Sequence, residues 1–321
     1  MQTFAMETAA KIMNTTLTEN RGEGLRLIDD AASVTPIVKA AMALNDDPRL
    51  KQIVDAFVEH AHAFLREVKL TDQEFEKGLQ FIAAVGQANT DSHNEVVLAA
   101  DVLGISTLVT VLNTTGQGDR TPGALLGPFY RGNAPECECG ADIARDGTPG
   151  APLFMRGVVR DTTGKPLANA LLDVWQASPV GLYDNQDPSQ PDKNLRGQFR
   201  TDEQGRYEIR SVRPAGYPVP VHGPIGTLLK MQHRHPYRPA HVHFIVSAAD
   251  HDTLVAQVFA DDSEYLETDV VFGVQRGLVG HFEWHEDGSF PWGDGAGPHY
   301  TLDFDFTLAA GTPTYPTPPI A

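Results

Sequence analysis

The chain has 321 residues and a formal net charge of −17, from 42 acidic side chains against 25 Lys and Arg. This charge argues against nucleic acid or an anionic membrane as a partner, and the sequence has no unbroken apolar run of transmembrane length. Its two cysteines, Cys137 and Cys139, are too few for a thiolate-rich metal site, and the first residues do not resemble a signal peptide, so we expect a cytoplasmic protein.

The first 120 residues have the pattern of a helical domain. Three segments carry apolar residues at helical spacing, and each follows a signal typical of a helix N-terminus. These signals are the Asp47-Pro48 pair, Thr71 with Glu74, and Ser92 with Glu95. The second helix is expected to close at Gly86 and the third to end near Asn113.

After Pro122 the pattern changes to short strands. Runs rich in β-branched and aromatic residues alternate with turns that contain Gly, Pro or Asp. The predicted strands are 155–160, 171–176, 199–201, 206–209, 241–247, 254–259 and 301–306. Strands this short predict an antiparallel sandwich of two sheets. We therefore expect a mostly β protein, with a helical domain at 1–120 and a β-sandwich domain at 121–321.

The strand predicted at 241–247 carries two histidines that could bind a metal ion. His241 and His243 are two residues apart, so their side chains point to the same face of the strand. His233 and His235 form a rival pair, but their charged, proline-broken segment predicts a loop. A rigid strand positions ligands better than a loop does, so we favour the strand pair. The same spacing also arises by chance on half-exposed strands.

Two tyrosines and two carboxylates are candidates to complete such a site. Tyr183 and Tyr217 lie in segments punctuated by Gly and Pro, where a tyrosine is not simply filling a strand position. Each could instead be an aromatic plug under a loop. A carboxylate would complete a two-histidine ferrous site, but Asp250 and Asp252 are expected in a loop that leads away.

Five motifs spread along the chain carry a resemblance to a known family. They are LGPFYR (126–131), ALLDVWQA (170–177), GLYD (181–184), FRTD (199–202) and RPAHVHF (238–244). Together they resemble the intradiol ring-cleavage dioxygenases, from about Phe81 to Leu308. That family uses a ferric ion, Fe(3+), and dioxygen to open dihydroxybenzene rings between the hydroxylated carbons. The resemblance implies four iron ligands, which are Tyr183, Tyr217, His241 and His243.

The ligand chemistry agrees with this implication. Free tyrosine has a pKa of about 10, so a tyrosinate at neutral pH needs a strong Lewis acid to hold it. Hard anionic oxygen ligands favour ferric over ferrous iron. The resemblance implies that the substrate displaces one tyrosinate, for which we expect Tyr217, and that this group accepts a substrate proton.

Two further residues are implied next to the iron. Arg238 precedes His241 by three residues and would stabilise negative charge that develops on the substrate ring; a salt bridge at the rim is the alternative. Gln257 interrupts an apolar strand, where a buried amide needs a partner, and the family places a glutamine beside this arginine.

Three segments, 217–226, 235–239 and 265–274, look most like the hydroxyquinol branch of the family. That branch converts 1,2,4-trihydroxybenzene to maleylacetate, and an acidic residue on a helix is associated with the third hydroxyl. Asp101 matches it, although a mid-helix ion pair is the alternative. Catechol and substituted or chlorinated catechols, which give muconates, remain alternative substrates. The implied pocket residues are Leu98, Asp101, Leu125, Leu126, Gly127, Pro128, Phe129, Val219 and Arg238.

The resemblance also implies a homodimer formed through the N-terminal helices, often with a phospholipid between them. Amphipathic helices alone show only apolar faces, which also pack within one chain. A second class of function stays open, because segments 157–161 and 164–170 also resemble transthyretin-like binding modules that are not enzymes. Such a module would not require the two tyrosines, two histidines and Arg238 together, and it would be colourless.

Overall fold

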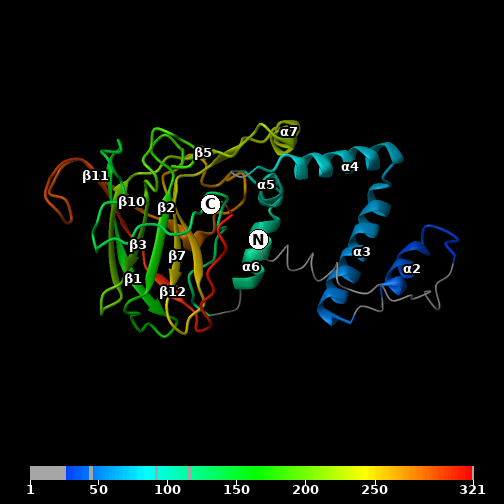
Figure 1. The fold of residues 1–321 in the computed structure, drawn as a ribbon, viewed down its shortest axis with the longest axis horizontal. Coiled ribbons are helices and arrows are strands. Elements are labelled where there is room, and N and C mark those ends of the chain that lie inside the picture. Colours follow the sequence, from blue (N-terminus) through cyan, green and yellow to red (C-terminus); the bar gives the residue numbers. More distant parts are fainter. Residues whose placement is uncertain (1–26, 43–45, 91–92, 115–117, 320–321) are drawn as a thin grey trace. The chain divides into compact units, whose positions relative to one another are not determined.

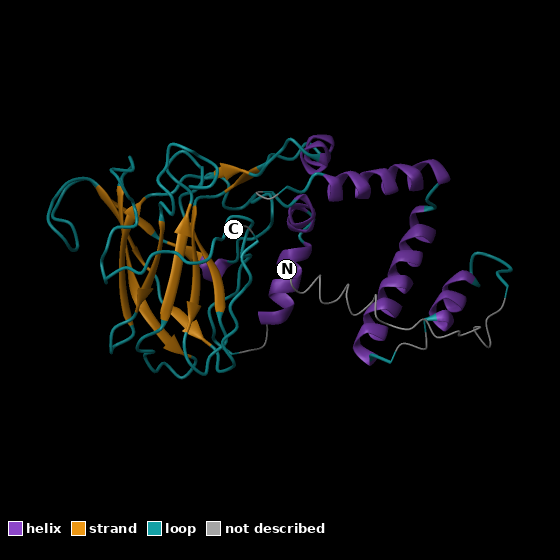
Figure 2. Cartoon of the chain, viewed as in Figure 1, coloured by secondary structure: helices purple, strands orange, loops and turns teal. Residues whose placement is uncertain are grey.

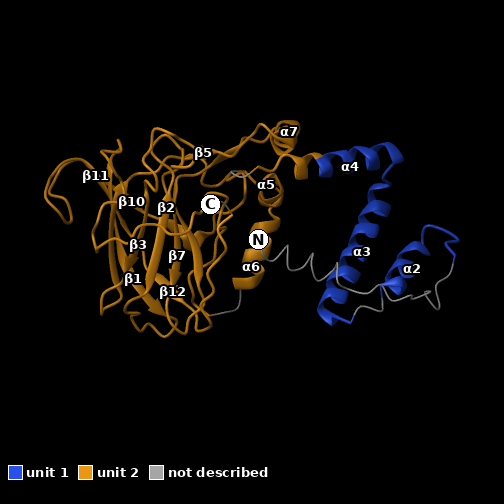
Figure 3. Cartoon of the chain, viewed as in Figure 1, with its two compact units in different colours: residues 1–83 blue, residues 84–321 orange. Residues whose placement is uncertain are grey.

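The computed structural model describes residues 27–42, 46–90, 93–114 and 118–319. Most helices come first in the chain, and strands follow from Pro152 onward with two short helices among them (Figures 1 and 2). The chain divides into two units, residues 1–83 and residues 84–321 (Figure 3). The helical domain of residues 1–120 and the sandwich domain of residues 121–321 follow the change in secondary structure instead, and that partition stays a prediction.

The first predicted helix begins where the sequence indicates. After α2 (Val34–Ala41), helix α3 spans Pro48–Val68. The Asp47 carboxylate accepts hydrogen bonds from the backbone N–H groups of Arg49 and Leu50, at 2.9 and 3.0 Å. This cap satisfies donors that the first turn leaves without intrahelical partners, so the predicted start is confirmed.

Helix α4 spans Asp72–Gln87 and begins with the predicted capping box. The Thr71 N–H donates to Glu74 Oε2 at 2.9 Å, and the Glu74 N–H donates back to Thr71 Oγ1 at 3.3 Å. Gly86 lies inside the helix, so the expectation that it closes α4 is wrong by one residue. A glycine in the last turn is tolerated because the cost of glycine relative to alanine is only about 1 kcal/mol.

Two short helices replace the single third helix that we expected. They are α5 (Glu95–Val102) and α6 (Ile105–Thr114), and Gly104 at φ +70° separates them. That backbone conformation suits glycine and ends a helix. Asn94 caps α5 by accepting the Val97 N–H at 2.9 Å. Ser92, the other half of the predicted capping signal, lies outside the described residues.

The first sheet of the sandwich is mixed. Strands run in the order β10-β11-β1-β12, and β4 also pairs with β1. Their bounds are β1 (Pro152–Asp161), β4 (Arg206–Val212), β10 (Phe282–His285), β11 (His299–Asp303) and β12 (Phe306–Leu308). β1 pairs antiparallel with β4 but parallel with β11 and β12. The expected sandwich is therefore present, but a purely antiparallel pairing is wrong, because the last strands run beside β1 in its own direction.

The strand predicted at 301–306 is divided between β11 and β12. Between them the Phe304 N–H donates to the Arg156 carbonyl at 2.9 Å. The neighbouring position must be glycine, because a Cβ on Gly157 would lie 1.9 Å from the Phe304 carbonyl oxygen. Strict alternation in this segment therefore predicts strand but not the break within it.

The second sheet carries the central strand of the site. Its order is β3-β2-β7-β8-β9, with all pairs antiparallel except β8 with β9. The bounds are β2 (Leu171–Gln176), β3 (Arg196–Arg200), β7 (His241–Ser247), β8 (Leu254–Ala260) and β9 (Val279–Gly280). In the register of these strands, His243 lies between Trp175 of β2 and Gln257 of β8.

A small two-stranded ribbon lies beyond the sheets. It consists of β5 (Tyr217–Pro218) and β6 (Tyr237–Arg238), which helix α7 (Pro224–Met231) connects. Tyr217 and Arg238 are partners in its register. The ribbon therefore brings two residues that are far apart in sequence to adjacent positions. The short 3₁₀ helix η1 (Arg276–Leu278) precedes β9.

The core between the two sheets is formed by large side chains that are almost completely buried. They include Phe199, Tyr207, Phe244 and Phe306. Burial of one such side chain stabilises the fold by about 1.5–3 kcal/mol, so β7 is firmly held. In the part of the chain that the structure describes, no single helix is long and apolar enough to cross a membrane; α5 and α6 meet that test only as a pair bent by 71°.

Candidate metal centre

Strand β7 separates the protein core from the candidate site. Val242, Phe244 and Val246 alternate along the strand and pack between the sheets. His241 and His243 therefore project from the opposite face, as side chains two residues apart must. Their Nε2 atoms lie 3.1 Å apart, and each residue is only 1% exposed. The rival pair, His233 and His235, follows α7 in a loop.

Both tyrosines predicted from the sequence lie next to these two histidines. The Tyr183 hydroxyl lies 3.1 Å from His243 Nε2 and 3.1 Å from the Tyr217 hydroxyl. The Tyr217 hydroxyl lies 3.4 Å from His241 Nε2. Two phenol oxygens and two imidazole nitrogens therefore form a closed ring of neighbours, inside a region from which water is largely excluded.

Aromatic packing fixes the rings from behind. Trp175 stacks on His243 with ring centroids 4.5 Å apart, and Phe129 stacks on Tyr183 at 4.6 Å. The Nδ1 atom of His241 lies 2.7 Å from the Pro239 carbonyl, which can only accept a hydrogen bond. The Nδ1 of a neutral His241 therefore carries the proton, and its Nε2 presents a lone pair to the centre.

The electrostatics of the site keep both imidazoles neutral. Burial and the nearby Arg238 charge lower the pKa of His241 to about 3. Burial, then His241 and Arg238, hold the pKa of His243 well below its ordinary range. Burial raises the pKa of the Tyr183 and Tyr217 phenols. Lone pairs this close repel one another, so a shared cation would stabilise the arrangement.

These residues fit a metal ion. Donors about 2.1 Å from one ion lie roughly 3.0–3.4 Å from their neighbours in common coordination geometries. The four donor atoms here are 3.1–3.4 Å from their neighbours. Over the described ranges, no group of three or more His, Cys, Asp or Glu side chains could hold a metal. Any metal site on these residues therefore depends on the two tyrosines, which points to a hard, highly charged cation.

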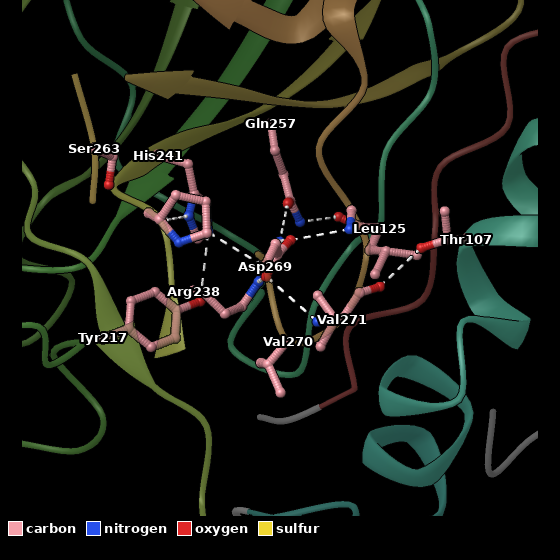
Figure 4. Close-up of polar contacts among 12 residues, drawn as sticks. Thr107, Leu125, Tyr217, Arg238, His241, Gln257, Ser263, Asp269, Val270 and Val271 are labelled. Atoms are coloured by element: carbon pink, nitrogen blue, oxygen red, sulfur yellow. Dashed lines mark hydrogen bonds and ion pairs between the residues drawn. The ribbon is translucent and has the colours of Figure 1, made fainter. Parts of the chain in front are cut away.

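Arg238 and Gln257 lie together beside the centre (Figure 4). Arg238 Nη1 is 3.4 Å from His241 Nε2, and Arg238 Nη2 donates to Gln257 Oε1 at 2.8 Å. The Gln257 amide donates in turn to the Leu125 carbonyl at 2.6 Å. The buried amide thus has partners on both sides, as a buried amide requires.

Asp269 belongs to this group, although the sequence analysis did not single it out. Its carboxylate accepts from Arg238 Nε and Nη2, both at 3.0 Å (Figure 4). The sequence signal was weak: a single acidic residue before the apolar Val270-Val271 pair.

A pocket opens next to Tyr217 and Arg238. It has about 460 Å³ of unfilled space, part of which is open to solvent. The residues that line it are His93, Asn94, Leu98, Asp101, Leu125, Gly127, Pro128, Phe129, Tyr217, Val219, Pro220, Arg238 and Val271. Of the expected pocket residues, Leu126 is not among these and packs instead against the aromatic cluster that contains Phe129. The lining residues His93, Asn94, Pro220 and Val271 were not expected.

Among the described residues that line this pocket, Asp101 is the one with a carboxylate. It lies on α5 and is 6% exposed. Burial raises the pKa of its carboxyl group, and a hydrogen bond from Ser106 and the Arg238 charge oppose that shift. A buried acceptor at this place would favour a ligand that brings a hydroxyl group to it.

Sequence and structure comparisons match this chain to ring-cleavage enzymes. A family model described as catechol dioxygenase N terminus matches residues 47–120, and one described as dioxygenase matches residues 125–310. A hydroxyquinol 1,2-dioxygenase of Rhizobium sp. is 40% identical over 90% of this chain and 98% of its own. A catechol 1,2-dioxygenase of Candida albicans is 39% identical over 86% of this chain and 91% of its own. The solved structure of a hydroxyquinol 1,2-dioxygenase from Pseudomonas putida has a TM-score of 0.82 and 36% identity, and the match covers 88% of this chain and 99% of that structure.

Proposed function

Since the chain belongs to the intradiol ring-cleavage dioxygenases, a family of enzymes, we propose that it cleaves hydroxyquinol (1,2,4-trihydroxybenzene) with dioxygen to give maleylacetate. The proposed cofactor is a ferric ion held by Tyr183, Tyr217, His241 and His243. The observation that carries the proposal is the convergence of these four donors beside a pocket with a buried carboxylate. The transthyretin-like binding module is set aside, because the family matches cover both parts of the chain.

When bound, ferric iron supplies a Lewis acid that activates the diol ring toward dioxygen. The two tyrosines have different places around it. Tyr217 lines the pocket, whereas Tyr183 lies under Phe129. Tyr217 Oη is therefore the ligand atom that an entering diol would meet and the one placed to accept a substrate proton. Tyr183 would stay in position throughout.

Arg238 supplies a fixed positive charge at the pocket wall. Its side chain is almost completely buried, and it lies between the pocket and His241. A guanidinium in a dry site stabilises anionic groups more strongly than one in water. Arg238 would therefore bind the deprotonated diol and stabilise the charge that develops on its ring during cleavage.

The proposed cofactor has a direct test. The purified protein should contain about one ferric ion per chain, have the red-brown charge-transfer band of tyrosinate on ferric iron, and consume dioxygen with hydroxyquinol. Chelation of the iron should remove both the band and the activity, and added iron should restore both. A colourless protein that neither retains iron nor consumes dioxygen would contradict the proposal and favour the binding module.

Asp101 is the proposed reason for the choice of substrate. A carboxylate on the pocket wall accepts a hydrogen bond from the third hydroxyl of hydroxyquinol, which catechol lacks. Two of the similar proteins are named hydroxyquinol 1,2-dioxygenases, whereas another is named a catechol 1,2-dioxygenase, so catechol is the second candidate substrate.

Asp101→Ala should lower kcat/KM for hydroxyquinol by roughly tenfold to a hundredfold and change kcat/KM for catechol much less. The reason is that a hydrogen bond from the third hydroxyl to a buried carboxylate is worth about 1.5–3 kcal/mol, and catechol does not form this bond. Steady-state kinetics on both substrates measure the effect. Asp101→Asn keeps the side-chain volume and one acceptor, and is the matched control. A wild type that cleaves both substrates equally well would exclude the hydroxyquinol assignment but not the ring-cleavage mechanism.

We further propose a cytoplasmic homodimer that forms through the N-terminal helices and holds a phospholipid. Unit 1 supports this proposal, since it leaves large apolar side chains exposed, among them Phe57 and Phe64 of α3 and Phe75 of α4. An apolar face of this kind marks an interaction site. Light scattering of the intact protein and mass spectrometry of extracted lipid would test the two parts separately.

A further inference from the structure

The guanidinium of Arg238 is held on one edge by Asp269 and Gln257, and its other edge faces the metal centre. Its Nε–H and one Nη2–H donate to the two oxygens of Asp269, and the other Nη2–H donates to Gln257. Three of its five N–H donors are therefore occupied away from the metal centre. The remaining amino group, Nη1, faces His241 Nε2 (Figure 4). The hydrogen bonds of Asp269 and Gln257 to the opposite edge therefore set the orientation of Nη1.

Asp269 is itself fixed in place. Its side chain is 2% exposed, and its Oδ2 atom accepts the Gly273 N–H at 2.9 Å. The same loop is attached to helix α6, because the Thr107 hydroxyl donates to the Val271 carbonyl at 3.1 Å (Figure 4). Because Asp269 and its loop are held in this way, the position of the Asp269 carboxylate fixes the position of the Arg238 guanidinium.

Gly273 shows how closely this pair is fitted. A Cβ at this position would lie 2.9 Å from Arg238 Nη2 and 3.1 Å from Asp269 Oδ2. Any larger residue would push the guanidinium away from its carboxylate. The loop therefore leaves room for the Arg238 guanidinium only because residue 273 is glycine.

Gln257 alone cannot fix the orientation of the guanidinium as Asp269 does. It offers one neutral oxygen to Nη2, whereas Asp269 offers two charged oxygens that match the guanidinium edge. Paired, charge-assisted hydrogen bonds fix orientation as well as distance. Four rotatable bonds separate the guanidinium from the backbone of Arg238, so without Asp269 its Nη1 group would sample several orientations.

We infer that Asp269 is a positioning residue for ring cleavage, which holds the Arg238 guanidinium so that Nη1 faces the substrate and metal centre. This inference rests on the proposed function, in which Arg238 stabilises charge on the substrate. Asp269 acts only through Arg238 and does not touch the substrate. Its loss should therefore slow turnover without removing the iron.

The test compares Asp269→Asn with wild-type holoenzyme. Asparagine keeps the shape of the side chain but removes the charge and one of the two acceptors. We expect kcat with hydroxyquinol to fall by about tenfold to a hundredfold, because small displacements of a catalytic group have effects of this order. Iron content and the visible charge-transfer band should not change, and the Kd for substrate measured without oxygen should change less than kcat.

Two further variants separate positioning from general instability. Gly273→Ala displaces the guanidinium but keeps the Asp269 charge, and it should lower kcat in the same way. Thr201→Val is the matched control, since Thr201 is a buried polar residue with hydrogen bonds to Leu167 and Ala170, beyond the end of β3. It should lower the melting temperature and leave kcat unchanged.

A double variant completes the experiment. In the Arg238→Ala background, Asp269→Asn should cause no further loss of kcat, because the partner through which Asp269 acts is already absent. An equal loss in both backgrounds would overturn the inference, as would an Asp269→Asn enzyme within twofold of the wild-type kcat. A wild type without any ring cleavage would overturn the proposed function as well, which distinguishes the two failures.

Discussion

Arg238→Ala is expected to lower kcat for ring cleavage by on the order of a hundredfold or more while the protein keeps its iron and its colour. The side chain provides a buried charge at the pocket wall, and its Nη1 group lies 3.4 Å from His241 Nε2. It is a neighbour of the four donors and not one of them. Activity should therefore separate from iron content, measured by single-turnover kinetics and iron analysis on the same preparation.

The control must account for the partner that this substitution leaves behind. Removing one member of a buried ion pair destabilises a protein by about 3–5 kcal/mol, and here Asp269 would remain buried and unpaired. Thermal unfolding should be followed alongside kcat. Arg156→Ala is the matched variant, because Arg156 forms an exposed ion pair with Asp303 on β11, and its loss should change neither quantity much. A loss of iron in Arg238→Ala would show that Arg238 supports the ligand strand instead.

Local patterns in the sequence were sufficient to predict the strand that carries the two histidines and the face that they share. The strand expected at 241–247 is β7, with the same bounds. The alternation of apolar and histidine positions places Val242, Phe244 and Val246 in the core and both histidines on the other face. A period of two is set by backbone geometry within one strand, so no distant contact is needed to predict it.

The convergence of Tyr183 and Tyr217 on this strand could not be derived from such patterns. Each lies in irregular chain, and its position depends on contacts with segments far away, such as the pairing of Tyr217 with Arg238 in the β5–β6 ribbon. The resemblance to the family supplied these two residues, and the structure brings them beside the histidines. Asp269 shows the limit, because neither pattern nor motif singled it out.

The errors in the fold have the same origin. Parallel pairing of β1 with β11 and β12 joins the first and last strands of the sandwich, a long-range choice that strand propensity does not encode. The break between α5 and α6 depends on one left-handed residue, Gly104, within an otherwise continuous apolar pattern. Short-range periodicity predicts which elements form, whereas their pairing and interruption follow from packing.

Tyr217→Phe should weaken or bleach the visible band and slow turnover by orders of magnitude while the fold persists. The substitution removes one of the two phenol oxygens at the centre, together with the group placed to accept a substrate proton. Loss of a single ring hydroxyl changes the buried volume little, so the aromatic packing against Phe129 should remain. Absorption spectroscopy, iron analysis and steady-state kinetics of one preparation measure the three effects.

Tyr207→Phe is the matched control for this prediction. Tyr207 is also a buried tyrosine, but it lies in the sandwich core and donates to the Phe304 carbonyl at 2.6 Å. Its loss should lower stability by about 1–3 kcal/mol through the unpaired carbonyl and leave the band and kcat as in the wild type. A Tyr217→Phe protein with an unchanged spectrum and near-normal turnover would remove Tyr217 from the ligand set. The neighbouring Tyr237, which is partly exposed in β6, would then be the next tyrosine to replace.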